Sequence, residues 1–245
     1  MTRQTVNSEG SVILYDEALI SQIDPQIFEP GHWPDAPRTA GKAGGRGAVL
    51  FINHAGQDWV LRHYYRGGLP GKLLTDRYLW TGESRVRSFC EWDLLRRMCD
   101  EGLPVPVPVA ARYVRHGISY TADLITVRLA DVTPLSLRLS NGAVSPELWA
   151  QIGACIARFH HAGFCHADLN AHNIQISGTN EIYVLDWDRG DQRVPSSWRN
   201  SNLARLHRSL NKISVGGALP LNDWQQLING YVDTLQAFPE QVGQA

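Results

Sequence analysis

The chain has 245 residues, 43% hydrophobic and 19% charged, so it can bury the core of one large domain or two small lobes. Its 22 glycines and 13 prolines follow no repeat, which excludes collagen-like, solenoid and low-complexity proteins. Apolar stretches are far shorter than the roughly 20 residues that span a bilayer, and the polar N-terminus lacks the pattern of a secretory signal. Four cysteines without a CxxC pair predict reduced thiols and a protein of the cytoplasm.

The net charge of −1 conceals two basic windows. Residues 60–97 hold eight Lys or Arg against four Asp or Glu, and residues 189–212 hold six against one. Such windows are typical of a protein with an anionic partner. Solvated helix faces with an excess of arginine would give the same pattern, so both interpretations stay open.

The first 130 residues have the pattern of strands and one helix. Phe89, Trp92 and Leu95 recur at helical spacing, which predicts a helix over 84–101 that stops at Gly102. Short runs rich in Val, Ile, Leu and Tyr, separated by turn residues, predict strands. These strands are expected at 11–15, 47–52, 58–65, 109–113 and 119–127.

From about residue 145 the periodicity becomes helical. Ser145-Pro146-Glu147 combines an N-cap, a first-turn proline and an acid, and it predicts a helix that ends near Gly163. Two short strands at 173–176 and 182–186 and helices at 198–213 and 221–238 are expected to follow.

We therefore expect an α+β, bilobal fold. Residues 1–129 would form a strand-rich N-lobe with five strands and one helix. Residues 130–245 would form a short, mainly helical C-lobe, separated from the N-lobe by a cleft. Together the lobes would make one domain.

The strongest chemical signal is the loop after the 145–162 helix, His166-Ala167-Asp168-Leu169-Asn170-Ala171-His172-Asn173, with Asp186 standing 18 residues beyond Asp168. The spacing matches the kinase catalytic loop, in which an Asp accepts the proton of the attacking hydroxyl. An Asn five residues on and a later Asp bind the magnesium that bridges the phosphates. We predict Asp168, His166 and Asn170 as catalytic residues, and Asn173 and Asp186 as Mg²⁺ ligands. A loop rich in Asp and Asn could by itself be ordinary turn chemistry, but the joint spacing favours a kinase.

A glycine-rich segment upstream is a candidate for binding ATP. Gly44, Gly45 and Gly47 precede an apolar run, and a hairpin of this kind lets backbone N–H groups approach phosphate oxygens. No Gly-Lys-Ser/Thr follows, so the segment is not a Walker A motif. A merely flexible hairpin would look similar.

A kinase also needs a cation on its third strand, paired with a glutamate on the front helix. Most kinases use lysine, whereas this strand carries Arg62. Arg62 is the first candidate for the phosphate contact, Lys72 is the second, and Glu91 is the expected partner. An arginine fork can hold phosphate bidentately.

Two other kinds of site are not expected. The histidines at 160, 161, 166 and 172 with Cys165 lack the spacing of a tetrahedral zinc site. Aromatic and basic residues do not alternate regularly, which indicates no nucleic-acid partner.

Taken together, the motifs resemble those of the 3-deoxy-D-manno-octulosonic acid (Kdo) kinases of Gram-negative bacteria, relatives of eukaryotic-type protein kinases. The resemblance covers about 40–215 and rests on the 166–173 loop and three further segments. These are Leu185-Asp186-Trp187-Asp188-Arg189-Gly190, Leu61-Arg62-His63-Tyr64-Tyr65-Arg66-Gly67-Gly68 and Arg77-Tyr78-Leu79-Trp80-Thr81-Gly82.

The resemblance implies a protein-kinase-like fold in which both lobes make one kinase-like domain. It also implies phosphorylation of the 4-hydroxyl of Kdo on Kdo-lipid IVA, with ATP and Mg²⁺, during lipopolysaccharide core synthesis. It places the protein at the cytoplasmic face of the inner membrane, as a peripheral protein on an anionic membrane surface. The basic windows could meet the sugar carboxylates and lipid A phosphates of such an acceptor.

Departures from protein kinases agree with a non-protein acceptor. Ala167 replaces the Arg of the HRD motif, Asp188 replaces the Gly of DFG, and no Ala-Pro-Glu follows. Two alternatives remain: another small-molecule kinase of this fold, of aminoglycoside or choline type, and a nucleotide-binding pseudokinase scaffold. The basic windows argue against the first, and the intact Asp168, Asn173 and Asp186 argue against the second.

Overall fold

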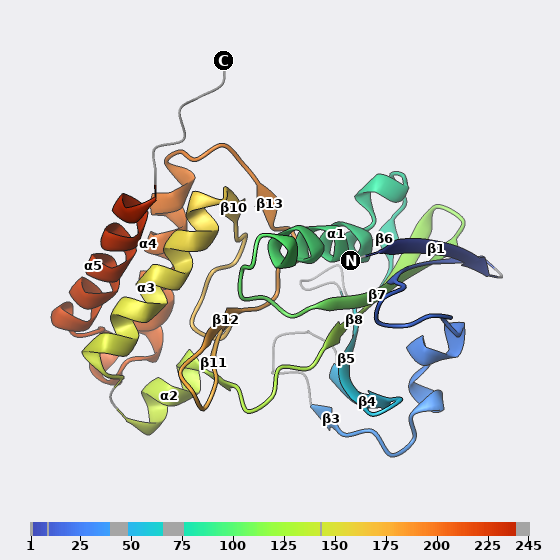
Figure 1. Cartoon of the computed structure of the whole chain (residues 1–245), viewed down its shortest axis with the longest axis horizontal. Coiled ribbons are helices and arrows are strands. Elements are labelled where there is room, and N and C mark those ends of the chain that lie inside the picture. The colour runs from blue at the N-terminus through green and yellow to red at the C-terminus, as the bar shows by residue number, and fades with distance from the viewer. Residues whose placement is uncertain (1, 9, 40–48, 66–75, 143, 239–245) are drawn as a thin grey trace. The chain divides into compact units, whose positions relative to one another are not determined.

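In the computed structural model of the chain, the described residues are 2–8, 10–39, 49–65, 76–142 and 144–238. They form two compact units (Figure 1). The N-terminal unit comprises the chain up to Glu101 together with Pro106–Leu129, and the C-terminal unit comprises Gly102–Val105 and the chain from Ala130 onward. None of the helices in the described ranges is long and apolar enough to cross a membrane. The glycine-rich segment and Lys72 lie outside the described residues.

An antiparallel sheet of eight strands dominates the N-terminal unit. Its order is β1-β2-β7-β8-β5-β4-β3, and β6 pairs with the start of β8. Helix α1 (Arg87–Asp100) packs against β7 and β8. The strands are β1 (Arg3–Ser8), β2 (Ser11–Asp16), β3 (Arg38–Thr39), β4 (Val49–His54), β5 (Gln57–His63), β6 (Tyr78–Leu79), β7 (Pro108–His116) and β8 (Ser119–Val127). The short 3-10 helices are η1 (Pro25–Phe28), η2 (Pro30–His32) and η4 (Glu83–Arg85).

The expectation of five strands in this unit is wrong, because β1, β3 and β6 add to the sheet. Among the described strands, β1 pairs with β2 alone, and it is exposed along nearly all its length, so its sequence carries no apolar alternation. β3 and β6 have two residues each, which is too short for a pattern to be recognised.

The two faces of β5 serve different purposes. Because successive side chains of a strand point to opposite faces, Leu61 packs in a buried cluster with Ile27 and Phe28 of η1. Arg62, the next residue, points to the opposite face and reaches Glu91 of α1. The alternation therefore brings a cationic side chain to the buried Glu91, on a helix whose buried residues are mainly apolar, such as Trp92.

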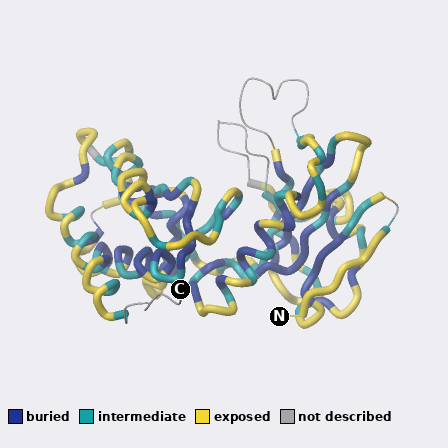
Figure 2. Tube along the Cα trace, turned by 90° about the horizontal axis from the view of Figure 1, so that it is seen from above, coloured by how far each residue is buried: buried dark blue, intermediate teal, exposed yellow. Residues whose placement is uncertain are grey.

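The C-terminal unit is mainly helical, with two small sheets. β11 lies between β9 and β12 in one sheet, and β10 pairs with β13 in the other. In each unit the buried segments lie in the interior and the exposed segments lie on the outside (Figure 2). The elements of this unit are β9 (Thr133–Pro134), α2 (Leu135–Asn141), α3 (Pro146–His161), β10 (Phe164–Cys165), β11 (Ile174–Ile176), β12 (Ile182–Val184), β13 (Asp191–Gln192), α4 (Trp198–Ile213), η5 (Val215–Gly217) and α5 (Leu221–Ala237).

Helices α3 and α5 lie side by side in this unit (Figure 1) and touch backbone to backbone. A Cβ atom on Gly153 of α3 would lie 1.9 Å from the carbonyl oxygen of Leu227. A Cβ on Gly230 of α5 would lie 2.1 Å from that of Ala150. Only glycine allows such an approach, so these two residues set the spacing between α3 and α5. Helix α3 precedes the loop 166–173.

Candidate active site

The loop 166–173 connects β10 to the strand β11, and His166 organises it. This side chain is only 2% exposed. The backbone N–H of Asp168 donates to His166 Nδ1 (3.0 Å), so the ring proton must lie on Nε2, which donates to the carbonyl oxygen of Leu185 (2.9 Å). A single neutral imidazole thus connects the start of the loop to the segment before Asp186.

Asp168 lies on the loop with its side chain 42% exposed. Its Oδ2 accepts a hydrogen bond from the side-chain amide of Asn170 (3.1 Å), and its Oδ1 contacts Nη1 of Arg205 on α4 at 3.1 Å. Asn170 also donates to the backbone oxygen of Asp168 (2.9 Å) and accepts from the N–H of His172 (2.9 Å). The carboxylate is therefore held in place from two sides while solvent still reaches it.

Helix α4 is attached to this loop at two points. The N–H of His166 donates to Asn202 Oδ1 and the N–H of Ala171 donates to Ser209 Oγ, both at 3.2 Å. These bonds satisfy buried backbone donors of the loop and determine where Arg205, between them in sequence, meets Asp168.

Asn173 is nearly buried, with 7% exposure. Its amide nitrogen donates to the backbone oxygen of Asp168 (3.0 Å), and its own backbone oxygen accepts from the N–H of Leu185 (2.8 Å). Within the described ranges, Oδ1 of Asn173 accepts no hydrogen bond. An amide oxygen held in this way is a suitable ligand for a hard cation.

Asp186 has an unusual backbone conformation, with φ at 64°. This left-handed region is strained for a residue with a Cβ atom, and such strain concentrates at functional sites. The turn is held on both sides: Leu185 bonds to His166 and Asn173, and the buried indole of Trp187 donates to the carbonyl oxygen of Val184 (3.0 Å). The surroundings therefore impose the conformation of Asp186.

The donor set fits a magnesium ion that shares its coordination with phosphates. In the part of the chain that the structure describes, no group of three or more His, Cys, Asp or Glu side chains could hold a metal ion by itself. Mg²⁺ in phosphoryl-transfer sites uses one or two protein oxygens, with substrate phosphates and water completing its shell. Asn173 and Asp186, connected through Leu185, carry side-chain oxygens that could serve as ligands of that kind.

The N-terminal unit contributes a compact polar triad. Arg62 Nη2 lies 2.5 Å from Glu91 Oε2 and 3.2 Å from the hydroxyl of Tyr64, which in turn donates to Glu91. Glu91 is 3% exposed and Arg62 is 26% exposed. Burial, with the neighbouring Glu91 charge, raises the pKa of Tyr64 well above its ordinary value, so this hydroxyl keeps its proton and remains a donor.

The structure therefore brings His166, Asp168, Asn170 and Asn173 together in one loop, with Asp186 connected to it, and it separately joins Arg62 to Glu91. Sequence patterns did not reveal four residues that contact these side chains or their loop. They are Tyr64, Asn202, Arg205 and Ser209.

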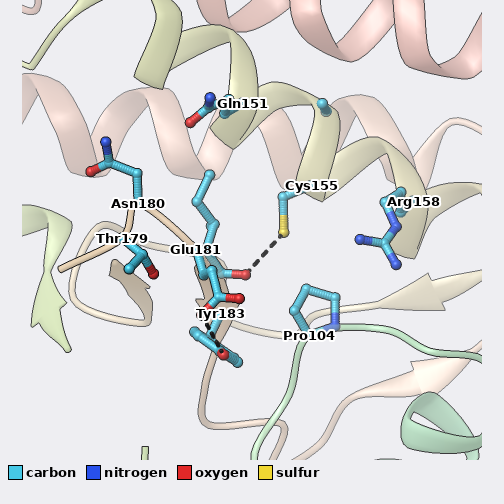
Figure 3. A pocket seen from close by; sticks show the side chains of 10 residues that line it. Pro104, Gln151, Cys155, Arg158, Thr179, Asn180, Glu181 and Tyr183 are labelled. Atoms are coloured by element: carbon cyan, nitrogen blue, oxygen red, sulfur yellow. Dashed lines mark hydrogen bonds between the residues drawn. The ribbon is translucent and has the colours of Figure 1, made fainter. Parts of the chain in front are cut away.

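A surface cavity of about 490 Å³ lies elsewhere in the C-terminal unit, between α3 and the β11–β12 hairpin (Figure 3). None of the predicted catalytic or metal-binding residues lines it. Cys155 faces it and donates weakly to the carbonyl oxygen of Ile182 (3.7 Å). Burial raises the pKa of this thiol to about 12, so Cys155 is a packing residue and not a nucleophile.

Comparison with known proteins identifies the family. Residues 32–231 match the model of the lipopolysaccharide kinase (Kdo/WaaP) family. A protein of Stenotrophomonas maltophilia (strain K279a) named 3-deoxy-D-manno-octulosonic acid kinase is 45% identical over 203 residues, which cover 82% of this chain and 80% of the relative. Proteins of the same name from Xanthomonas euvesicatoria pv. vesicatoria (strain 85-10) and Xylella fastidiosa (strain M23) are each 44% identical, covering 82% and 84% of this chain and 80% and 82% of the relative, respectively. The chain therefore belongs to the lipopolysaccharide kinase (Kdo/WaaP) family.

Proposed function

We propose that this enzyme transfers the γ-phosphoryl group of ATP to the 4-hydroxyl of the Kdo residue on Kdo-lipid IVA, in the synthesis of the lipopolysaccharide core. Membership of the Kdo/WaaP family and the shared name of its relatives support a kinase that acts on Kdo. The observation that carries the proposal is the half-exposed Asp168, held in a loop that is hydrogen-bonded to the strained turn at Asp186. The family does not favour an aminoglycoside or choline acceptor.

Asp168 would act as the base. Its carboxylate accepts a hydrogen bond from the acceptor hydroxyl, orients the oxygen toward the γ-phosphorus and takes up the proton as the new P–O bond forms. The bond from the γ-phosphorus to the oxygen bridging it to the β-phosphate breaks, and ADP leaves with that electron pair. Asn170, which donates to Asp168 Oδ2, keeps the carboxylate in the required orientation.

The remaining residues would hold the nucleotide. Asn173 and Asp186 would bind Mg²⁺, which neutralises charge on the phosphates when it is bound. Arg62 would contact the α- and β-phosphates, and Glu91 and Tyr64 would keep its guanidinium in place. Because Glu91 is buried, this pair loses less of its strength to solvent than a surface ion pair.

A peripheral position on the inner membrane is part of the proposal. At one end of the sheet, Leu79 and Ile118 are 66% and 80% exposed, and the N–H of Trp80 donates to the carbonyl oxygen of Ile118 (2.8 Å). The exposed Arg115 stacks over Trp80 at 4.8 Å. Exposed aliphatic groups beside an aromatic ring and a cation suit the interface of an anionic leaflet.

Mass spectrometry of purified Kdo-lipid IVA, incubated with the enzyme, ATP and Mg²⁺, tests this function. We expect a gain of one phosphate on the Kdo residue, and fragmentation should place it on the 4-hydroxyl. An acceptor of unchanged mass, in the presence of an enzyme that binds nucleotide, would contradict the proposal.

A further inference from the structure

Arg205 is presented to the catalytic loop by a helix that is hydrogen-bonded to that loop at two points. Asn202, Arg205 and Ser209 of α4 are spaced by three and four residues, so they share one helix face. The outer two bond to the loop backbone, and the fully buried Leu206 and Leu210 anchor the adjoining face of the helix. The Arg205 side chain nevertheless remains 48% exposed.

Most of the hydrogen-bonding capacity of Arg205 remains available. In the described part of the chain its recorded contact is Nη1 to Asp168 Oδ1, at 3.1 Å. A guanidinium carries five N–H donors in a planar fork that matches a carboxylate. An ion pair between groups 48% and 42% exposed is weak, so an incoming ligand can replace it at low cost.

An acceptor hydroxyl bonded to Asp168 arrives beside this guanidinium. A neutral sugar would disturb the ion pair and offer Arg205 no charge in return. A sugar acid brings its own carboxylate on the same ring as the hydroxyl, so it can occupy both residues at once. From this geometry we infer that Arg205 binds the carboxylate of the acceptor sugar while Asp168 binds its hydroxyl, and that this exchange selects a sugar acid over a neutral sugar. The inference rests on the proposed function, which it deepens.

Two acceptors in nonionic micelles test the pairing: Kdo-lipid IVA, and a synthetic analogue in which a carboxamide replaces the Kdo carboxylate. For the wild type, the carboxamide should lower kcat/KM about 10- to 100-fold, since a hydrogen-bonded charge pair is lost. Arg205→Ala should raise KM for Kdo-lipid IVA by a similar factor and leave KM for ATP unchanged. With this variant the carboxamide should lower kcat/KM by less than about 3-fold, because the guanidinium that would bind the carboxylate is already absent.

Two further variants serve as controls. Arg205→Lys should recover part of the affinity, because the charge survives without the fork. Arg208→Ala removes an exposed arginine three residues further along α4 and should behave as the wild type with both acceptors. Thermal unfolding should confirm that all three variants are folded.

Three results would overturn the inference. If the carboxamide lowers kcat/KM of Arg205→Ala as strongly as that of the wild type, another group binds the carboxylate. A rise in KM for ATP, with the acceptor unaffected, would place Arg205 on the phosphates instead. If the wild type phosphorylates neither acceptor, the proposed function fails and this inference fails with it, whereas the first two results leave the function standing.

Discussion

Replacing Arg62 with alanine tests whether the triad of the N-terminal unit is a coupled group. The change leaves the Glu91 carboxylate, 3% exposed, with the Tyr64 hydroxyl as its remaining partner among the described residues. Breaking a fully buried pair costs about 3–5 kcal/mol. Because Arg62 is 26% exposed, we expect a smaller loss, about 2–3 kcal/mol in the free energy of unfolding. At roughly 2–4 °C per kcal/mol, Tm should fall by about 4–12 °C.

Adding Glu91→Gln to this variant gives the sharper result. It removes the stranded charge, so the double variant should be more stable than Arg62→Ala alone, although Glu91→Gln destabilises the wild type. Urea denaturation of the four proteins measures this coupling. If Glu91→Gln lowers stability equally in both backgrounds, the two side chains are not coupled and the reasoning is refuted.

The same variants test the role of Arg62 in catalysis. Arg62→Ala should raise KM for ATP and lower kcat, and Arg62→Lys should keep part of the activity. Lys72→Ala is the matched comparison. A crippled Lys72→Ala beside a near-normal Arg62→Ala would assign the phosphate contact to Lys72.

Three other variants or conditions test the structure. Gly153→Ala should lower the free energy of unfolding, measured by urea denaturation, by about 2–3 kcal/mol, because its methyl group would lie 1.9 Å from the Leu227 carbonyl oxygen. Gly178→Ala, whose methyl group would have nothing within 4 Å, should leave the stability unchanged, and equal effects of the two changes would contradict the packing described for α3 and α5. Burial lowers the pKa of His160 from 6.5 to about 4, so the unfolded chain binds the proton first as the pH falls. The contribution of His160 to the free energy of unfolding is therefore complete above pH 6.5 and should decline by about 3 kcal/mol toward pH 4. If a His160→Gln variant loses stability equally steeply, this pH dependence belongs to other groups. In sedimentation with anionic vesicles, binding at low salt should weaken at about 0.5 M salt and in Arg115→Glu, whereas equal binding to neutral vesicles would exclude a role for charge.

Much of the fold follows from local patterns. The strand at 119–127 and the helix at 198–213 have the bounds expected from their apolar periodicity, and Ser145 caps α3 by accepting from the N–H of Leu148. Segment 17–37 was not predicted, because its short 3-10 helices have no period and are held by tertiary packing of Ile27 and Phe28. Helix α2 was missed because, at seven residues, it is too short for a convincing period.

The candidate site, like the fold, combines residues that local patterns point to with residues that only tertiary packing brings together. Asp168, Asn173 and Asp186 could be proposed from the sequence because their expected roles depend on spacing along one segment of chain. The Arg205 contact joins residues 37 positions apart, and it depends on how α4 docks on the loop, which no local pattern records. Tyr64 escapes sequence analysis for a related reason: a tyrosine in an expected strand is usually a packing residue, and only the position of Glu91 on α1 reveals its hydrogen bond.

The most direct test of the account separates the roles of Asp168 and Asp186. Titration of Mg-ATP into Asp168→Asn and Asp186→Asn, followed by calorimetry and combined with turnover on Kdo-lipid IVA, makes the comparison. We predict that Asp168→Asn binds Mg-ATP nearly as tightly as the wild type and loses turnover by about 100-fold or more, whereas Asp186→Asn loses both Mg-ATP binding and turnover. Equal loss of nucleotide binding in the two variants, or normal turnover by Asp168→Asn, would contradict the assignment of Asp168 as the base.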